Sequence, residues 1–172
     1  MLRLLRSADP KAGERLQSLY RDALVRFCWG YLGRLEEAED AYQEISLKIL
    51  SAESLPERFR PWMYRVARNH CLNLLRRSRG EAPGLPRAAS QIHESLTGQL
   101  TRIVRDEDRA RLEALVSALS DTHREVLRLR YVEGLSRGEI AEVLELTESV
   151  VKSRVYEGLK QLKLHADNIR PS

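Results

Sequence analysis

The stretch at residues 139–163, EIAEVLELTESVVKSRVYEGLKQLK, contains two apolar helical patterns separated by the short break ELT. The first pattern predicts a short helix whose inward side is formed by Ile140, Ala141 and Leu144. The second predicts a longer helix, from Glu148 to about Leu164, with a buried stripe at helical spacing. This stripe consists of Val151, Val155, Leu159 and Leu162. Two helices joined by a tight turn form a helix-turn-helix, which occurs both in DNA-binding domains and as an ordinary helical hairpin.

Capping signals support both helices. Ser136 and Glu139 have the spacing of a capping box, and Thr147 is in position to cap the second helix. The small side chain of Ala141 allows the second helix to cross the first closely. Glu148 lies in the first turn of the second helix, where a carboxylate stabilises the helix dipole by about 0.3–1 kcal/mol. Its charge therefore does not argue against DNA binding.

The side of the second helix opposite its buried stripe has the composition of a DNA-reading surface. A helix in the major groove needs cations for phosphates, polar groups for base edges and apolar contacts for thymine methyl groups. The candidates are Ser149, Val150, Lys152, Ser153, Arg154 and Tyr156, with Lys160 beyond them. Spacing alone leaves open the alternative that these residues form a solvated face.

The rest of the chain also predicts helices. Proline and glycine are sparse and alternating strand patterns are few, so we expect an all-α fold. Asp9 and Pro10 mark the start of a first helix, and Gly33 permits the turn after it. The further expected elements are helices at about 35–50, 62–77 and 106–119, a loop at 51–61, and a helix that begins after Ser120 or Asp121 and ends at Gly134.

Apolar spacing predicts which faces of these helices are buried. For the helix at 35–50 the buried face is Ala38, Ala41, Tyr42, Ile45 and Ile49. For the helix that begins after Ser120 or Asp121 the apolar residues are Val126, Leu127, Leu129 and Tyr131.

The composition changes at residues 79–91, RGEAPGLPRAASQ, which contain two glycines, two prolines and several small residues. Such a segment is typical of a flexible linker. We therefore expect two small helical domains, at residues 1–80 and 106–172, joined by a linker at 81–105. The second domain contains the helix-turn-helix.

Positive charge is concentrated in one segment. The net charge is only +4, and residues 1–50 contain eight basic and eight acidic side chains. Residues 58–79, in contrast, contain seven arginines and no acidic residue. A cationic run of this kind either binds phosphates or forms a solvated face.

No set of residues supports an enzyme or a metal protein. The sequence has no glycine-rich phosphate loop, no nucleophile constellation and no metal-ligand cluster.

Cys28 and Cys71 each lie in an apolar helical pattern, which predicts two buried thiols. No apolar run is long enough to span a bilayer, and the N-terminus MLRLLRSADP has no signal-peptide cleavage site. We expect a cytoplasmic, non-enzymatic protein without a cofactor.

Three segments together resemble a known family. Residues 119–163, LSDTHREVLRLRYVEGLSRGEIAEVLELTESVVKSRVYEGLKQLK, resemble the C-terminal promoter-reading domain of bacterial sigma factors. AEDAYQEISLKIL, at 38–50, is similar to their helix that binds the polymerase clamp, and FRPWMYRVARNHCLNLLRR, at 59–77, to their helix for the promoter −10 element. With both domains, a short linker and nothing else, the chain resembles an extracytoplasmic-function (ECF) sigma factor, over residues 16–77 and 114–163.

The resemblance implies roles for specific residues. Asp40, Gln43 and Glu44 would bind core RNA polymerase at the coiled coil of its β′ clamp, although a solvated helix face is the alternative. Residues implied to contact the −10 element are Phe59, Arg60, Trp62, Arg65, Arg68, Asn69, Asn73, Arg76 and Arg77. The loop at 51–60 would receive a flipped base, on which Phe59 and Trp62 could stack unless they belong to the core. Residues implied to contact the −35 element are Ser149, Val150, Lys152, Ser153, Arg154 and Tyr156.

Several positions depart from the family pattern. Asn73 stands where many members carry Asp, which alters a contact to the −10 strand or a local salt bridge. In the turn, Glu145 replaces the glycine that the family usually has, so this position either avoids positive φ or accepts strain. Near the start of the second helix, Thr147, Ser149 and Val150 replace the family's usual Pro, Gly and Thr, respectively. A −35 consensus borrowed from the family is therefore not expected to apply.

The resemblance implies an ECF sigma factor that binds core polymerase, directs transcription from specific promoters and helps to open the −10 region. It further implies contact of the C-terminal domain with the β flap, control by an anti-sigma factor that is often membrane-bound, and association with the nucleoid in the holoenzyme. Two alternatives are an autonomous helix-turn-helix regulator and a sigma-like decoy that sequesters a partner without binding DNA.

Overall fold

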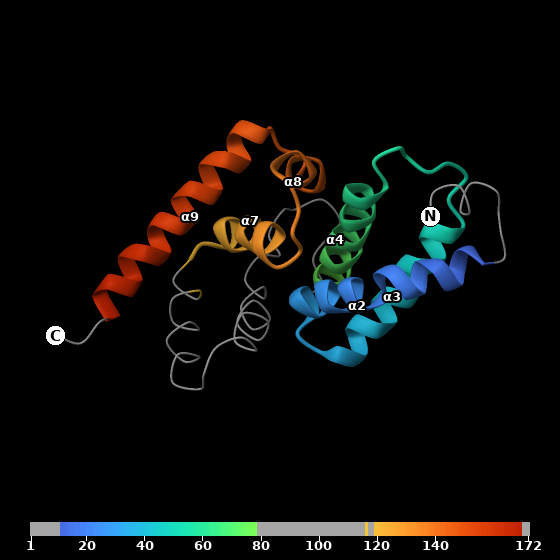
Figure 1. Cartoon of the computed structure of the whole chain (residues 1–172). Helices are drawn as coiled ribbons and strands as arrows, with labels where there is room; N and C mark the ends of the chain where they lie inside the picture. Colours follow the sequence, from blue (N-terminus) through green and yellow to red (C-terminus); the bar gives the residue numbers. More distant parts are fainter. Residues whose placement is uncertain (1–10, 79–115, 117–118, 170–172) are drawn as a thin grey trace. The chain divides into compact units, whose positions relative to one another are not determined.

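The chain forms two compact units, Met1–Ala88 and Ala89–Ser172. The computed structural model describes residues 11–78, 116 and 119–169 (Figure 1). Over these residues the secondary structure is helical, without a strand. The expected all-α fold with two helical domains is therefore confirmed. The expected linker at 81–105 lies outside the described residues, as does nearly all of the expected helix at 106–119.

Within residues 11–78, the first unit contains the helices α2 (Ala12–Leu32), α3 (Leu35–Leu50) and α4 (Phe59–Ser78). Helix α3 packs along α2, and α4 packs against both (Figure 1). The turn between α2 and α3 is made by Gly33, which has φ 77° and donates its N–H to the carbonyl of Trp29 at 2.8 Å. Glycine adopts this left-handed conformation without steric cost, as the sequence predicted. The expected start at Asp9 and Pro10 lies outside the described residues.

An aromatic cluster forms the centre of this unit. The ring of Phe27, which is fully buried, lies 5.1 Å from that of Tyr31 and 5.0 Å from that of Tyr64. These distances are typical of favourable aromatic pairs. The five predicted inward residues of α3 are all buried, and Cys28 and Cys71 are buried thiols. The predictions for the α3 face and for the two cysteines are thus confirmed.

The start of α4 differs from the sequence prediction. The expected loop extended to residue 61, but α4 begins at Phe59 and includes Pro61 in its first turn. Proline is tolerated there because the first N–H groups of a helix have no intrahelical acceptor. The prediction failed because proline was taken to end a loop, whereas here it lies inside a helix.

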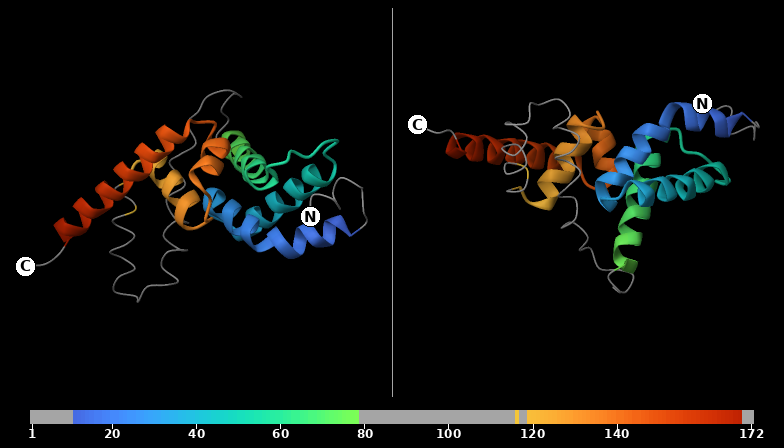
Figure 2. Two further views of the ribbon diagram at one scale, coloured as in Figure 1. Left: turned by 45° about the horizontal axis from the view of Figure 1, so that its top comes forward. Right: turned by 90° about the horizontal axis from the view of Figure 1, so that it is seen from below.

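The second unit contains α7 (Asp121–Tyr131), α8 (Arg137–Leu144) and α9 (Glu148–Ile169), in which α9 packs against both shorter helices (Figure 2). Gly134, at φ 63°, lies in the turn that follows α7, and the N–H of Leu135 bonds to the carbonyl of Leu129 at 2.9 Å. This pattern closes a helix C-terminus. The predicted terminating role of Gly134 is confirmed.

The buried side of α9 is only partly as predicted. Val151 is fully buried, but Leu159 is 42% exposed and Gly158 is buried in its place. A Cβ atom at Gly158 would lie 3.0 Å from Leu127 Cδ1 and 3.4 Å from His123 Cβ, both on α7. Because α9 approaches α7 most closely where a side chain is absent, a pattern of large apolar residues does not reveal this face.

The inward side of α8 is also only partly as predicted. Ile140 and Ala141 are buried, but Val143 is fully buried where Leu144, which is half-buried, was expected. On α7, Val126, Leu127 and Leu129 are buried, whereas Tyr131 in the last turn is exposed.

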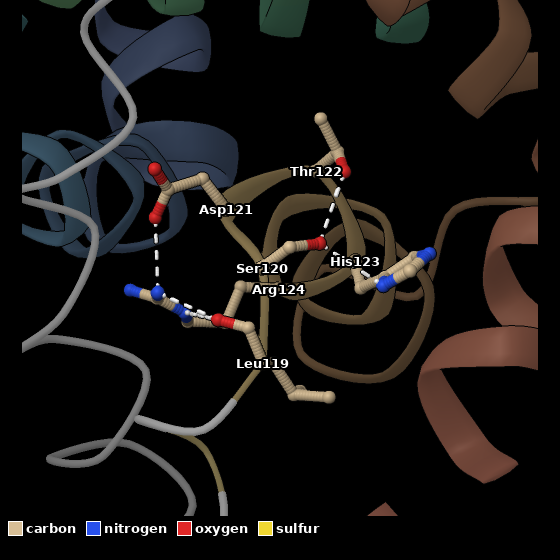
Figure 3. A network of polar contacts seen from close by, with 6 residues as sticks. All are labelled: Leu119, Ser120, Asp121, Thr122, His123 and Arg124. Carbon is tan, nitrogen blue, oxygen red and sulfur yellow. Dashed lines mark hydrogen bonds and ion pairs between the residues drawn. The ribbon is translucent and has the colours of Figure 1, made fainter. Parts of the chain in front are cut away.

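A buried arginine anchors the start of α7 (Figure 3). Arg124 is buried, and its Nε and Nη2 donate to the carbonyl of Leu119 at 3.2 and 2.8 Å. Nη2 also lies 2.9 Å from the carboxylate of Asp121. Burial lowers the pKa of Arg124, and Asp121 opposes this effect. The segment before α7 is therefore tied to the helix by a side chain that the sequence pattern had placed in no role.

Of the two residues predicted to precede α7, Ser120 is the N-cap. Its hydroxyl, however, forms no hydrogen bond with the backbone of the helix. The hydroxyl oxygen lies 3.2 Å from Thr122 Oγ1 and 3.0 Å from His123 Nδ1 (Figure 3). The same His123 nitrogen lies 3.2 Å from Gln161 Oε1 of α9. Ser120 thus belongs to a side-chain cluster that joins α7 to α9.

The turn of the helix-turn-helix contains a strained residue. Ser136 and Glu139 form the predicted capping box at the start of α8. At the other end of α8, Glu145 has φ 56° and ψ 45° and is the one non-glycine residue with positive φ in the described part of the chain. Of the two alternatives given by the sequence, Glu145 accepts the strain.

Replacing Glu145 by glycine is therefore expected to stabilise the second unit by about 1 kcal/mol, because a left-handed conformation costs an L-residue about 1–2 kcal/mol and the added freedom of the unfolded glycine offsets part of the gain. Urea unfolding of the full chain, followed by circular dichroism, measures this difference. Glu145→Ala is the matched control, since alanine also loses the carboxylate but keeps Cβ. Equal stability of the glycine and alanine variants would show that the turn is unstrained.

Candidate nucleic-acid interface

The first candidate surface is the outward side of α9. Thr147 precedes this helix and its Oγ1 accepts from the N–H of Val150 at 3.3 Å, as predicted for a cap. Five of the six predicted −35 residues have exposed side chains and Arg154 is half-buried. Tyr156 is 65% exposed. This surface therefore offers a phenol, hydroxyls, a lysine, an arginine and a small apolar group to a groove, which is the mixture that direct readout requires.

The second candidate surface lies on α4. Asn69, Asn73 and Arg77 are exposed, whereas Arg60, Trp62, Arg65, Arg68 and Arg76 are half-buried. Eight of the nine predicted −10 residues are therefore at least partly accessible at the surface of the first unit, although Nε of Arg76 is buried.

Phe59 is the exception. It is only 5% exposed, and its ring lies 5.9 Å from that of Tyr20 and 5.8 Å from that of Trp62. The ring contacts two other aromatic side chains, so Phe59 lies in the core, which is one of the two alternatives that the sequence left open for this residue. Trp62, half-buried at the edge of this cluster, retains part of its surface.

Asn73 and Arg76 form a local pair on α4. Arg76 Nη1 donates to Asn73 Oδ1 at 3.2 Å. An amide in this position orients the guanidinium but leaves its positive charge uncompensated, which a carboxylate would not do. At Asn73 the guanidinium of Arg76 therefore donates a charge-assisted hydrogen bond to a neutral amide, in place of a salt bridge to a carboxylate.

The third candidate surface is the exposed side of α3, with Asp40, Gln43 and Glu44 all exposed. Leu47, one turn further along, is 67% exposed and adds an apolar group to the same face. The sequence reasoning missed Leu47, although its spacing from Gln43 indicates that the two share a face. Carboxylates, an amide and an exposed leucine on one helix are suited to binding a basic protein surface.

A buried histidine lies beneath this face and was also missed. His70 of α4 is 7% exposed, and its Nδ1 lies 2.9 Å from Nζ of Lys48, while its Nε2 lies 3.7 Å from Oε2 of Glu44. Burial is the main cause that lowers the pKa of His70, and the positive charge of Lys48 lowers it further. The signal in the sequence was its spacing of three from the buried Ala67 of α4.

Over the described residues, no cluster of three or more His, Cys, Asp or Glu side chains is placed to hold a metal ion. In the same part of the chain, none of the helices combines the length and the apolar character that crossing a membrane requires.

Two family models match the two units. The model described as Sigma-70 region 2 matches residues 16–81, and that described as Sigma-70, region 4 matches residues 109–162. Similar curated proteins include the ECF RNA polymerase sigma factor SigW of Bacillus subtilis, which is 24% identical over 94% of this chain and 92% of its own length. The ECF RNA polymerase sigma factor SigL of Mycobacterium tuberculosis is 28% identical over 87% of each chain.

The chain belongs to the ECF family of sigma-70 factors. It is thus an RNA polymerase sigma factor, a regulatory and non-catalytic protein that acts with core polymerase and promoter DNA in promoter-specific transcription. The region 2 match contains α3, α4 and most of α2, and the region 4 match contains α7, α8 and the first two thirds of α9. All three candidate surfaces of this sigma factor lie within the matched residues.

Proposed function

We propose that this ECF sigma factor uses each candidate surface for a different contact. The exposed side of α3 binds the β′ clamp of core polymerase, the arginine-rich side of α4 binds the −10 element, and the outward side of α9 binds the −35 element in the major groove. The observation that carries the proposal is the exposure of the predicted face of α9. This helix is the second helix of a complete helix-turn-helix, and Thr147 caps its N-terminus.

Charge complementarity supports the polymerase contact. Asp40 and Glu44 present two exposed carboxylates one turn apart on α3. Arginines of a basic coiled coil can form charge-assisted hydrogen bonds with them. The C-terminal unit adds a second contact, to the β flap, which places both units on the same polymerase.

The −10 contact combines strand binding with strand opening. The arginine run without an acidic residue attracts the phosphates of an opened strand. Flipping a base out of the duplex costs a few kcal/mol, which a pocket and a stacking surface offset. The segment between α3 and α4 is the proposed site for the flipped base, with Trp62 beside it.

Joining two weak modules explains why promoter binding requires polymerase. A correct contact to a base contributes only about 1–3 kcal/mol. When both units are held on core polymerase, binding of one element raises the effective concentration of the other unit at its own element. An anti-sigma factor that holds the units in a form unable to engage polymerase would control this step. A protein with this function acts in the cytoplasm and at the nucleoid.

Transcription with purified core polymerase on genomic fragments, followed by mapping of start sites, tests the proposal. The expected result is transcripts that begin at defined positions only when the protein is added. Sequence-specific DNA binding by the protein alone, without dependence on polymerase, would favour an autonomous helix-turn-helix regulator. Polymerase binding without any promoter-specific transcript would favour a sigma-like decoy.

The outward face of α9 makes a testable distinction between base contacts and phosphate contacts. Val150→Thr and Ser149→Gly are expected to change which −35 sequence is preferred, because these side chains differ from the family at the DNA-facing edge. Lys152→Ala is expected to weaken transcription from all −35 variants by a similar factor, since a phosphate contact carries no base information. Transcription from a library of −35 variants measures both. Equal losses across the library for Val150→Thr and Ser149→Gly would contradict the assignment.

A further inference from the structure

An unusual group lies directly beneath the polymerase-binding face of α3. The imidazole of His70 comes from α4, is 7% exposed and contacts two side chains of α3. Lys48 Nζ lies 2.9 Å from its Nδ1, and Glu44 Oε2 lies 3.7 Å from its Nε2. On its own helix, Arg77 contributes a positive charge nearby. The ring therefore lies between a cation and the carboxylate that is proposed to bind polymerase.

The contact with Lys48 determines where the proton of the imidazole resides. A lysine ammonium has only donors, so Nδ1 of His70 must be the acceptor and the proton is on Nε2. Burial lowers the pKa of His70, as do the charges of Lys48 and Arg77, while Glu44 opposes them. The ring is consequently neutral near pH 7, with an N–H group at Nε2.

Within the described residues, the Nε2–H group of His70 is a buried hydrogen-bond donor without an acceptor. A buried unsatisfied donor costs free energy. The separation of 3.7 Å from Glu44 is slightly longer than a hydrogen bond. The side chain of Glu44 is 62% exposed, so it is not held in place by packing, and a small movement toward Nε2 would complete the hydrogen bond.

We infer that His70 is a positioning residue for polymerase binding: it holds Lys48 through Nδ1 and donates from Nε2 to Glu44 when the carboxylate engages the clamp. One carboxylate oxygen is then fixed by His70 and the other faces the incoming cation. Fixing the carboxylate beforehand lowers the entropy cost of docking, and the hydrogen bond strengthens as water leaves the interface. The inference rests on the proposed polymerase-binding role of Glu44.

A double-mutant cycle on the full chain tests this inference. The affinity for purified core polymerase is measured by competition with a fluorescent sigma factor for wild type, His70→Leu, Glu44→Ala and the double variant. His70→Leu is expected to weaken binding about fivefold, in the range found for directly coupled side chains. In the Glu44→Ala background it is expected to have no further effect. His70→Gln keeps both a hydrogen-bond acceptor and a donor, and it is expected to retain most of the affinity that His70→Leu loses. A side chain that only fills the same volume would not have this effect.

The outcomes separate the inference from the proposed function. If Glu44→Ala leaves core affinity unchanged, both the docking role of Glu44 and the inference fail. If Glu44→Ala weakens binding but the effect of His70→Leu adds to it in full, only the inference fails. Thermal unfolding of each variant shows whether the first unit remains folded.

A second measurement needs no substitution at His70. Nitrogen chemical shifts of labelled histidine in the full-length protein report which ring nitrogen carries the proton. The Nε2–H tautomer is expected, with a titration midpoint below the ordinary histidine value that falls further in Glu44→Gln. A proton on Nδ1, or a midpoint that Glu44→Gln leaves unchanged, would overturn the inference.

Discussion

Reversing the charge of Arg76 and Arg77 together is expected to reduce promoter-specific transcription by about 100-fold or more. A hydrogen bond to a charged group contributes about 1.5–3 kcal/mol, so the loss of two phosphate contacts exceeds about 3 kcal/mol, and about 1.4 kcal/mol corresponds to a factor of ten. Repulsion between the new carboxylates and the phosphates adds to this loss. Multi-round transcription from a promoter identified by start-site mapping measures the change.

Two controls isolate the DNA contact. Lys11→Glu, at the N-cap of α2, combined with Arg15→Glu in its first turn changes the net charge by the same amount, and both residues precede the first residue matched by the region 2 model. This control is expected to retain most transcription. Affinity for core polymerase, measured separately, should be unchanged in the Arg76 and Arg77 variant. Full transcription by the doubly reversed protein would instead support a function without DNA binding at α4.

Gly158→Leu is expected to destabilise the second unit by about 2 kcal/mol and to abolish most −35-dependent transcription. A Cβ atom at this position already approaches Leu127 Cγ to 3.3 Å and His123 Cβ to 3.4 Å, and neither is the flexible end of a side chain. Overpacking typically costs about 1–3 kcal/mol. Leucine is a much better helix former than glycine, so a loss of stability can only come from packing between α7 and α9.

A compensating substitution provides the control for this prediction. Leu127→Ala in the Gly158→Leu background makes room on α7 for the new side chain and is expected to recover at least half of the lost stability. Lys160→Leu places the same side chain on the exposed side of α9 and is expected to be neutral. Urea unfolding followed by circular dichroism measures all four proteins. Similar losses for Gly158→Leu and Lys160→Leu would contradict the close crossing of α7 and α9.

Much of the candidate site follows from local sequence rules. The capping box at Ser136, the Thr147 cap and the exposed outward residues of α9 are all present as the pattern predicts. The same holds for the polar side of α3, because a helix with one apolar stripe must direct its carboxylates away from it. These features depend on residues within a few turns of each other, and their periodicity is visible in the sequence alone.

Other features were decided by tertiary packing. Phe59 is a core residue because Tyr20 from α2 and Trp62 meet it, and Leu159 is exposed because Gly158 marks the crossing with α7. His70 of α4 meets Lys48 of α3, with Nδ1 and Nζ 2.9 Å apart, only because the two helices pack against each other. The helices, their caps and their polar faces follow from local sequence, since they depend on neighbouring residues. Which apolar side chain is covered, and which buried polar atoms meet, depends on how helices distant in the sequence cross, and this is visible only in the folded structure.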